Sequence, residues 1–453
     1  MAEAPKARRA IKNDLIVTHC TAISKKEKTV PLKYFQLTNR SINYLSLIKL
    51  FNMETLIDPS VPVRQKDLVE IAAGLGPEIG QYVDEEESNG RLSAPVVNAL
   101  KKEGFFKLFL PRSLGGHEAD PVTTARVVEE VARHNAAAAW SLMVANTTIF
   151  MGGHIPEKGI EEIFEGNPEV LLAGSIHPPM KATRADGGYL LNGRNPLVSN
   201  VHEGQWIFVS ALVMENGQMK IKDGHPEIIG AIINAHDCTI IDTWYTLGMR
   251  ATDSNDVEVK NAFIPDHLSF PLSPEFNPGR HFSGPLYKFP AAGANIASLL
   301  APVTMGIARN AIDELKVLAD KKTPLGSMVP IRERGVVQRK LGRAEALVQS
   351  SRAFLYQKLS ETWSRIVTGG VISLEEKAAL LLAATHANQG CVEAIELMYT
   401  AAGTNGIYKK NRLSRYFSDA QVLRQHGFMN ESRYETAGQI YFGLPPDLPL
   451  VTF

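Results

Sequence analysis

Apolar positions between Asp67 and Ile163 recur at intervals of three and four residues, which is the spacing of one helix face. The clearest run is Leu68, Ile71, Ala72, Leu75 and Ile79. Thr123–Val144 repeats the pattern with valines and small alanines, and Pro111 breaks it in between. The pattern predicts an N-terminal helical domain over residues 53–167.

The pattern changes at residue 168. Four short runs of β-branched and aromatic residues follow, each bounded by Gly, Asn or Pro: YLLNG, WIFVSALV, IIGAIIN and DVEVKNAFIP. Such runs are typical of strands joined by tight turns. They predict a central small β-barrel domain over residues 168–285.

Long helical patterns return after Ala291. They cover 296–319, 332–367, 373–402 and 413–426. Ser373 and Glu376 have the spacing of a capped helix start. Four long helices in succession predict an up-and-down C-terminal four-helix bundle over residues 286–453. The expected fold class is therefore α+β, in the order helical, β, helical.

The first 52 residues differ from the rest of the chain. They are rich in Lys and Arg, as in KARRAIKND and SKKEK, and show no sustained apolar period. We expect this segment to be disordered. It could be a transit peptide, but it lacks an Arg-rich amphipathic helix. The favoured interpretation is an N-terminal extension ahead of a start at Met53.

Composition narrows the class of protein. The chain has 453 residues, 44% of them hydrophobic, with 48 basic against 48 acidic side chains. Zero net charge argues against a nucleic-acid or anionic-membrane protein, and no run approaches the ~20 apolar residues of a membrane span. The three cysteines are far apart and the histidines lack metal-ligand spacing, so we expect neither disulfides nor a metal site. A reducing cytoplasm is the expected compartment.

Three segments resemble one family. LPRSLGGHEAD (110–120) is similar to its P-x-x-x-G-G loop, GGYLLNGRNPLVSNVHEGQWIFVSA (187–211) to its strand, hairpin and strand against the flavin, and LGMRATDSNDVEVKNAFIPD (247–266) to its G-x-R loop and following strand. From residue 53 to 453 the chain thus resembles the acyl-CoA dehydrogenase superfamily. The resemblance implies bound flavin and a homotetramer.

Two chemistries occur on this scaffold, and the sequence resembles the monooxygenase branch. AGSIHPPMKATRADGGY (173–189) is similar to a stretch of that branch and replaces the T-E-x-x-A-G-S-D loop of dehydrogenases. The resemblance implies a two-component oxygenase. Reduced FMN or FAD would come from a separate NAD(P)H-dependent reductase, react with O2 to a C4a-hydroperoxide, and oxygenate a small aromatic or heteroaromatic substrate.

The C-terminal helix distinguishes the two chemistries. Dehydrogenases carry a catalytic Glu eight residues after an Asp, and from Asp419 that position holds Gly427; monooxygenases carry a His seven residues after it, and that position holds His426. RYETAGQI (433–440) also resembles the dehydrogenase Y-E-G-T motif, with Glu435 as base, if eight residues are inserted. An acyl-CoA dehydrogenase using Glu435 and a non-catalytic flavin-fold binding protein therefore remain alternatives.

The resemblance also implies individual roles. Ser199 would hydrogen-bond flavin N5 and the peroxide, and Trp206 would shield the isoalloxazine. His426 would accept a phenolic or indolic proton or bond the distal peroxide oxygen; alternatively it only satisfies a helix end. Further flavin contacts are expected from the turn residues, a bundle Gln near the adenine end, and a Gly-rich loop (401–408) of a neighbouring subunit: Ser175, Arg250, Thr252, Ser254, Gln338, Gly403 and Asn405.

Overall fold

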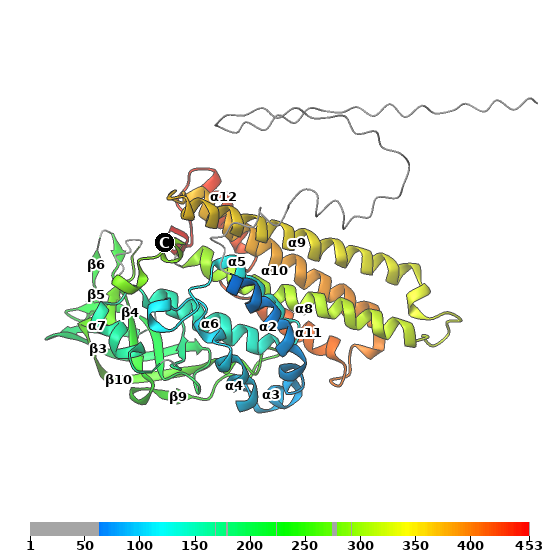
Figure 1. Ribbon diagram of the computed structural model, residues 1–453, viewed down its shortest axis with the longest axis horizontal. Helices are drawn as coiled ribbons and strands as arrows, with labels where there is room; N and C mark the ends of the chain where they lie inside the picture. The colour runs from blue at the N-terminus through cyan, green and yellow to red at the C-terminus, as the bar shows by residue number, and fades with distance from the viewer. Residues whose placement is uncertain are drawn as a thin grey trace, which may run out of the picture. The chain divides into compact units, whose positions relative to one another are not determined.

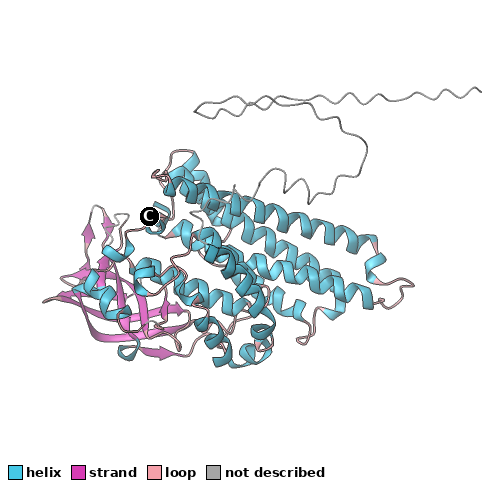
Figure 2. Cartoon of the chain, in the orientation of Figure 1, coloured by secondary structure: helices cyan, strands magenta, loops and turns pink. Residues whose placement is uncertain are grey.

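The computed structural model describes residues 63–452, apart from 168, 178–179, 223, 274–278 and 291. The expected disorder of residues 1–52 and the start at Met53 lie outside the described residues. Helices come first along the chain, a sheet follows, and helices return (Figure 1; Figure 2). The α+β fold class is therefore confirmed.

The N-terminal helices follow from local capping and burial. Their bounds are α2 (Val63–Gly80), α3 (Val83–Asn89), α4 (Ala94–Lys102), α5 (Pro121–Ala132), α6 (Ala136–Gly152) and α7 (Glu157–Phe164). Asp120 caps α5 through the Thr123 amide, and Asn135 caps α6 through the Ala138 amide. Helix α6 is apolar on nearly all sides because it packs against strand β1, α5 and α8 at once. It therefore lies where the sheet meets the bundle.

The strands form one large sheet in the order β11-β8-β4-β2-β3-β10-β9, with β1 and β5 also paired to β4. Their bounds are β1 (Leu172–Gly174), β2 (Met180–Ala185), β3 (Gly188–Val198), β4 (Trp206–Glu215), β5 (Gln218–Met219), β8 (Ile228–Asn234), β9 (Thr239–Ile241), β10 (Asn255–Pro265) and β11 (Ser269–Pro271). A separate pair joins β6 (Ile221–Lys222) to β7 (His225–Pro226). Strand β4 is buried along most of its length because it has partners on both sides.

The C-terminal helices pack around one central helix. Their bounds are α8 (Gly293–Lys321), α9 (Gly335–Val367), α10 (Leu374–Ala402), α11 (Arg412–Arg424) and α12 (Ser432–Tyr441). Helix α10 contacts the other four, and small residues such as Ala383 and Ala387 are fully buried there. The predicted capping box of Ser373 and Glu376 is confirmed. No helix in the described part of the chain is long and apolar enough to cross a bilayer.

One predicted helix is shorter than expected. The pattern predicted helix from 413 to 426, whereas α11 ends at Arg424 and its last turn tightens, with the His426 amide bonded to the Leu423 carbonyl. Asp419 therefore lies inside the helix and His426 in the turn after it. Two helical turns would place side chains seven residues apart on one face, but the helix ends before His426, so Asp419 and His426 do not share one helical face.

Candidate active site

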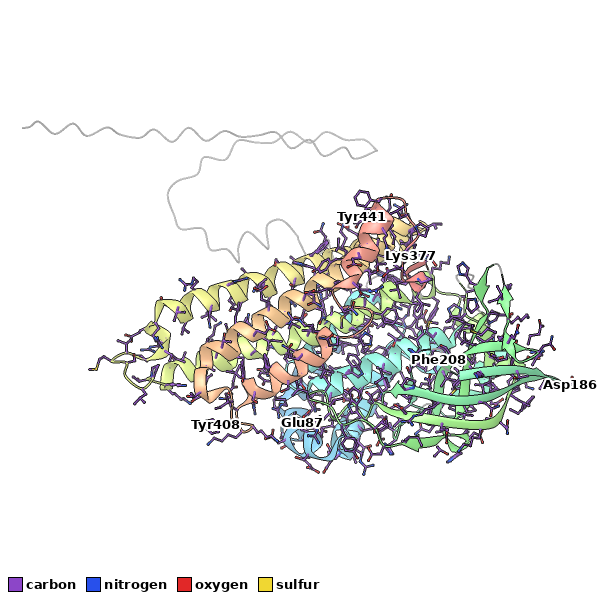
Figure 3. All side chains as sticks on the ribbon, turned by 180° about the vertical axis from the view of Figure 1, so that it is seen from behind. Glu87, Asp186, Phe208, Lys377, Tyr408 and Tyr441 are labelled. Carbon is purple, nitrogen blue, oxygen red and sulfur yellow. The ribbon has the colours of Figure 1, made fainter. Side chains whose placement is uncertain are left out.

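A cavity of about 490 Å³ lies where α6, the sheet and the end of α11 meet. Its walls are mostly apolar and aromatic, including Trp140, Met143, Phe208, Trp244, Leu300 and Phe428. Phe208 lies on β4 where the sheet faces the helices (Figure 3). Among the described residues that line the cavity there is no Asp, Glu, Lys or Arg. The cavity is thus apolar and without a permanent charge of its own.

A row of three hydroxyl groups forms one polar wall. Ser199 Oγ lies 2.8 Å from Ser254 Oγ, which lies 2.7 Å from Thr252 Oγ1, and Thr252 donates to the Met249 carbonyl at 2.9 Å. Each hydroxyl has one proton, so the direction of the row is fixed. Ser254 donates to Thr252, and Ser199 donates to Ser254. The oxygen of Ser199 is left to the cavity as an acceptor.

Trp140 connects this row to His426. Its indole N–H donates to Ser199 Oγ at 3.0 Å, and its ring meets the His426 ring edge to face, with centroids 5.4 Å apart. Both contacts come from α6, which is held on several sides by the core. One rigid side chain therefore positions both candidate catalytic residues.

His426 is held in the turn after α11. The backbone N–H of Phe428 donates to its Nδ1 at 3.3 Å. The ring lines the cavity and retains some exposure there. Burial of its other sides lowers the pKa of His426 to about 4. The imidazole is therefore neutral at physiological pH.

The loop before β10 is fixed by buried polar groups. The Met249 carbonyl accepts from Trp244 Nε1 at 3.0 Å, and its amide donates to Asp419 Oδ1 at 2.6 Å. Met249 and Asp253 have φ values of 52°, a conformation that costs energy outside glycine. Burial and the charge of Glu87 raise the pKa of Asp419 to about 7. The side chain of Asp419 on α11 therefore stabilises the loop conformation.

The lining residues suit a flavin ring system. A flavin has flat apolar faces and a polar edge of ring nitrogens and oxygens. The aromatic walls match the faces, and the Ser199, Ser254 and Thr252 row matches the edge. Because no described lining residue is cationic, the cavity suits the ring rather than the phosphates.

Comparisons with known proteins identify the family. The models "acyl-CoA dehydrogenase, N-terminal domain" and "acyl-CoA dehydrogenase, C-terminal domain" match residues 70–163 and 298–431, together half of the chain. The chain belongs to the acyl-CoA dehydrogenase superfamily. This superfamily membership agrees with the resemblance of its motifs.

Relatives in this superfamily extend over most of the chain. The indole-3-acetate monooxygenase of Acinetobacter baumannii is 28% identical over 80% of this chain and 90% of that relative. The flavin-dependent monooxygenase oxygenase subunit HsaA of Mycobacterium tuberculosis is 26% identical over 85% and 98%. XiaF from Streptomyces, solved with FADH2 and glycerol, superposes with a TM-score of 0.78 at 24% identity, covering 85% and 97%. This last likeness supports the acyl-CoA dehydrogenase-like fold.

The structure brings five of the predicted site residues together at the cavity: Ser175, Ser199, Thr252, Ser254 and His426. Trp206 begins β4 and is not in the lining; Phe208, two residues further on, is. Arg250 follows Met249, and its backbone N–H bonds Glu87.

The other predicted residues lie outside the cavity. Gln338 is exposed at the start of α9, where it donates to the Arg332 carbonyl, and Gly403 and Asn405 form the short turn after α10. Glu435 is exposed on α12. The dehydrogenase alternative therefore has no carboxylate base among the described lining residues.

Sequence reasoning missed four aromatic residues of the lining, Trp140, Phe208, Trp244 and Phe428. Trp140 lies in an Ala-rich helix that is buried on nearly all sides, so no periodicity separates a cavity residue from a core residue there. Phe208 shared a strand with the predicted Trp206 and could have been found by its alternation along β4. Trp244 precedes the G-x-R loop and had no motif of its own.

Proposed function

We propose that this chain is the oxygenase component of a two-component flavin-dependent monooxygenase. It uses reduced FMN or FAD and O2 to oxygenate a small aromatic or heteroaromatic substrate. One observation carries the proposal: His426 and a hydroxyl row face the cavity, and no described lining residue is a carboxylate. A dehydrogenase needs a carboxylate base at its substrate, whereas oxygen transfer needs an apolar, water-excluding pocket with hydrogen-bonding groups.

The names of the relatives support this assignment. One is an indole-3-acetate monooxygenase and another is the oxygenase subunit of a flavin-dependent monooxygenase. An oxygenase subunit implies a separate protein that reduces the flavin. We therefore include an NAD(P)H-dependent flavin reductase as partner.

The flavin and the residues of the cavity have separate roles in the proposed reaction. Bound reduced flavin supplies the electrons that activate O2. Ser199 would help to hold the reduced ring by accepting from one of its N–H groups, since its own proton is given to Ser254. Trp140, Phe208 and Trp244 exclude water from the cavity. His426 contacts the substrate.

The predicted residues outside the cavity have a role in an assembly. In a homotetramer, Gln338 and the turn of Gly403 and Asn405 would contact the flavin dinucleotide of a neighbouring subunit, and Arg250 would support the loop that Thr252 and Ser254 continue. The described cysteines, Cys238 and Cys391, are both free, which is consistent with a reducing cytoplasm.

Rapid mixing tests the proposal. Flavin-loaded protein is reduced anaerobically, mixed with oxygenated buffer, and followed by absorbance. A transient species that precedes the oxidised-flavin spectrum, together with oxygenated product from a phenol, indole or thiophene, supports the proposal. Direct return of oxidised flavin, with bleaching by acyl-CoA that Glu435→Gln abolishes, would instead establish the dehydrogenase. Failure to bind reduced FMN or FAD would leave a non-catalytic protein.

A further inference from the structure

We propose that the cavity takes an uncharged aromatic molecule, anchors one of its acceptor atoms through an N–H donated by His426 Nε2, and rejects aromatic carboxylates. This inference rests on the proposed function and names the substrate class of the same site. Three features carry it: the hydrogen bond at Nδ1, the uncharged lining, and the partners of the nearest charged groups.

The hydrogen bond at Nδ1 fixes the tautomer of His426. A backbone N–H can only donate, and that of Phe428 points at Nδ1 from 3.3 Å, so Nδ1 must be the nitrogen without a proton. The low pKa of about 4 keeps the ring neutral, and its single proton is then on Nε2. The Trp140 ring meets the imidazole edge to face, and this contact does not change which imidazole nitrogen carries the proton. Toward a ligand, Nε2 is a donor and not a base.

No described lining residue is a Lys or Arg that would hold an anion. Its described polar groups are hydroxyls, two indole N–H groups, Gln425 and the imidazoles of His177 and His426. Of the two indole donors, Trp140 is bonded to Ser199 and Trp244 to the Met249 carbonyl. Thr252, Ser254 and Ser199 give their protons to one another and to a carbonyl. The donors left to face a carboxylate are the Thr148 and Ser175 hydroxyls, the Gln425 amide and the imidazoles, none of which is a Lys or Arg.

The charged groups nearest in sequence lie outside the cavity lining. The backbone N–H of Arg250 bonds Glu87, which lines a separate small cavity together with Asp419 and Arg415, and the Arg250 side-chain Nε is buried without a hydrogen-bond partner. Asp253 is paired with His202, whose Nδ1 lies 2.8 Å from its carboxylate. Burying a carboxylate without a cation costs several kcal/mol, and neutral hydrogen-bond donors alone offset only part of that cost. An uncharged ring can be buried without this desolvation cost.

This preference for uncharged ligands would distinguish the chain from one of its relatives. That relative is named for indole-3-acetate, which is a carboxylate at neutral pH. Because the described lining carries no charge, we expect this chain to prefer an uncharged molecule of similar size that carries an oxygen or another acceptor.

A matched pair of ligands tests the charge preference. Calorimetry measures binding of methyl indole-3-acetate and of indole-3-acetate to the anaerobic, flavin-loaded protein at neutral pH. The two share the indole ring and the acetate skeleton, and they differ in charge and in the one methyl group of the ester. We expect the ester to bind at least about tenfold more tightly. Equal or tighter binding of the acid, or no binding of the ester at millimolar concentration, overturns the inference.

Variants test the donor. His426→Gln keeps an N–H donor near the Nε2 position, and His426→Phe removes it. We expect Gln to retain most of the ester affinity and Phe to lose about tenfold. His177→Gln is the matched control, because His177 is the other imidazole in the described lining and is exposed. A loss of ester affinity in His177→Gln, with none in His426→Phe, would show that His177 and not His426 anchors the ligand, and it would overturn the inference.

Nitrogen-15 NMR of labelled histidine reads the tautomer without turnover. The signal that disappears in His426→Gln should show an unprotonated Nδ1 and a protonated Nε2 across neutral pH. A proton on Nδ1 contradicts the donor role. If rapid mixing shows oxygen activation while the acid binds better than the ester, the inference fails and the proposed function stands. If no oxygen activation or product is found, the proposed function fails whatever the ligand preference.

Discussion

Trp140 is the side chain on which both candidate catalytic residues depend. Trp140→Phe keeps an aromatic ring against His426 but removes the N–H that Ser199 accepts. Ser199 could then rotate, and we expect affinity for reduced flavin to fall about tenfold, the value of one buried hydrogen bond. Anaerobic flavin titration measures the change.

Trp206→Phe is the matched control for that variant, because Trp206 is half-buried on β4 and outside the cavity. It should leave flavin affinity within about twofold. An equal loss in both variants would instead give Trp206 the shielding role that the resemblance implied.

Asp419 and His426 make stability depend on pH in opposite directions. The pKa of Asp419 rises from 3.8 to about 7 on folding, so its contribution to stability is lost as pH rises through that window. The pKa of His426 falls from 6.5 to about 4, so its contribution is lost as pH falls through that range. Neutral pH is therefore unfavourable for Asp419 and favourable for His426.

Asp419→Asn isolates the first effect, because an amide oxygen still accepts the Met249 N–H. We expect the variant to be more stable than the parent by about 1–3 kcal/mol near pH 8, with a smaller difference near pH 5. Urea unfolding at both pH values measures it. The exposed control Asp237→Asn should change stability by less than about 0.5 kcal/mol. A gain that is the same at both pH values would rule out titration of Asp419 as its cause.

The loop before β10 is pressed against helix α11 at Gly248. A Cβ at this position would overlap the backbone of Ser418 and Asp419. Gly248→Ala must therefore push the loop away from the helix, and with it the Thr252 and Ser254 hydroxyls. We expect a loss of about 1–3 kcal/mol and weakened flavin binding, measured by thermal unfolding and titration.

Gly438→Ala in α12 is the control for that substitution. No atom lies within 4 Å of the added Cβ, and alanine favours a helix interior by up to about 1 kcal/mol. It should be neutral or stabilising. Similar losses in both variants would mean that the close approach at Gly248 does not matter.

The elements were predictable because their signals are local. Helix capping at Ser373 and the β-branched and aromatic run of β4 depend on neighbouring residues, and both were confirmed. The end of α11 lies two residues before the predicted one, because its last turn tightens, with the His426 amide bonded to the Leu423 carbonyl. Ser199 and His426 were found through motifs. Trp140 was not, because its role arises only when α6 packs between the sheet and the bundle.

The cavity belongs to the whole fold rather than to any one domain. Its described lining comes from α6, the sheet, the loop before β10, α8, the turn after α11 and the C-terminal segment. The cavity forms only when segments separated by as many as 310 residues, from Trp140 to Leu450, pack together. Its uncharged character is likewise a property of that assembly, since the full chain has 96 charged side chains.

Exposed apolar side chains gather toward one end of the bundle. Leu325 and Met328 lie in the α8–α9 connection, and Ile407 and Tyr408 in the α10–α11 connection (Figure 1; Figure 3 labels Tyr408). Apolar clusters of this kind mark contacts with other proteins. The nearby turn of Gly403 is the one proposed to reach a neighbour's flavin.

We therefore expect light scattering to give four times the chain mass of 49.7 kDa. The double variant Leu325→Glu/Met328→Glu should shift the population to smaller assemblies and weaken FAD binding more than FMN binding, because the neighbour's turn would contact only the dinucleotide. Leu444→Glu, at another exposed apolar position after α12, should leave the mass unchanged. A monomeric parent would mean that there is no subunit contact. An intact assembly in the double variant would place the contact elsewhere.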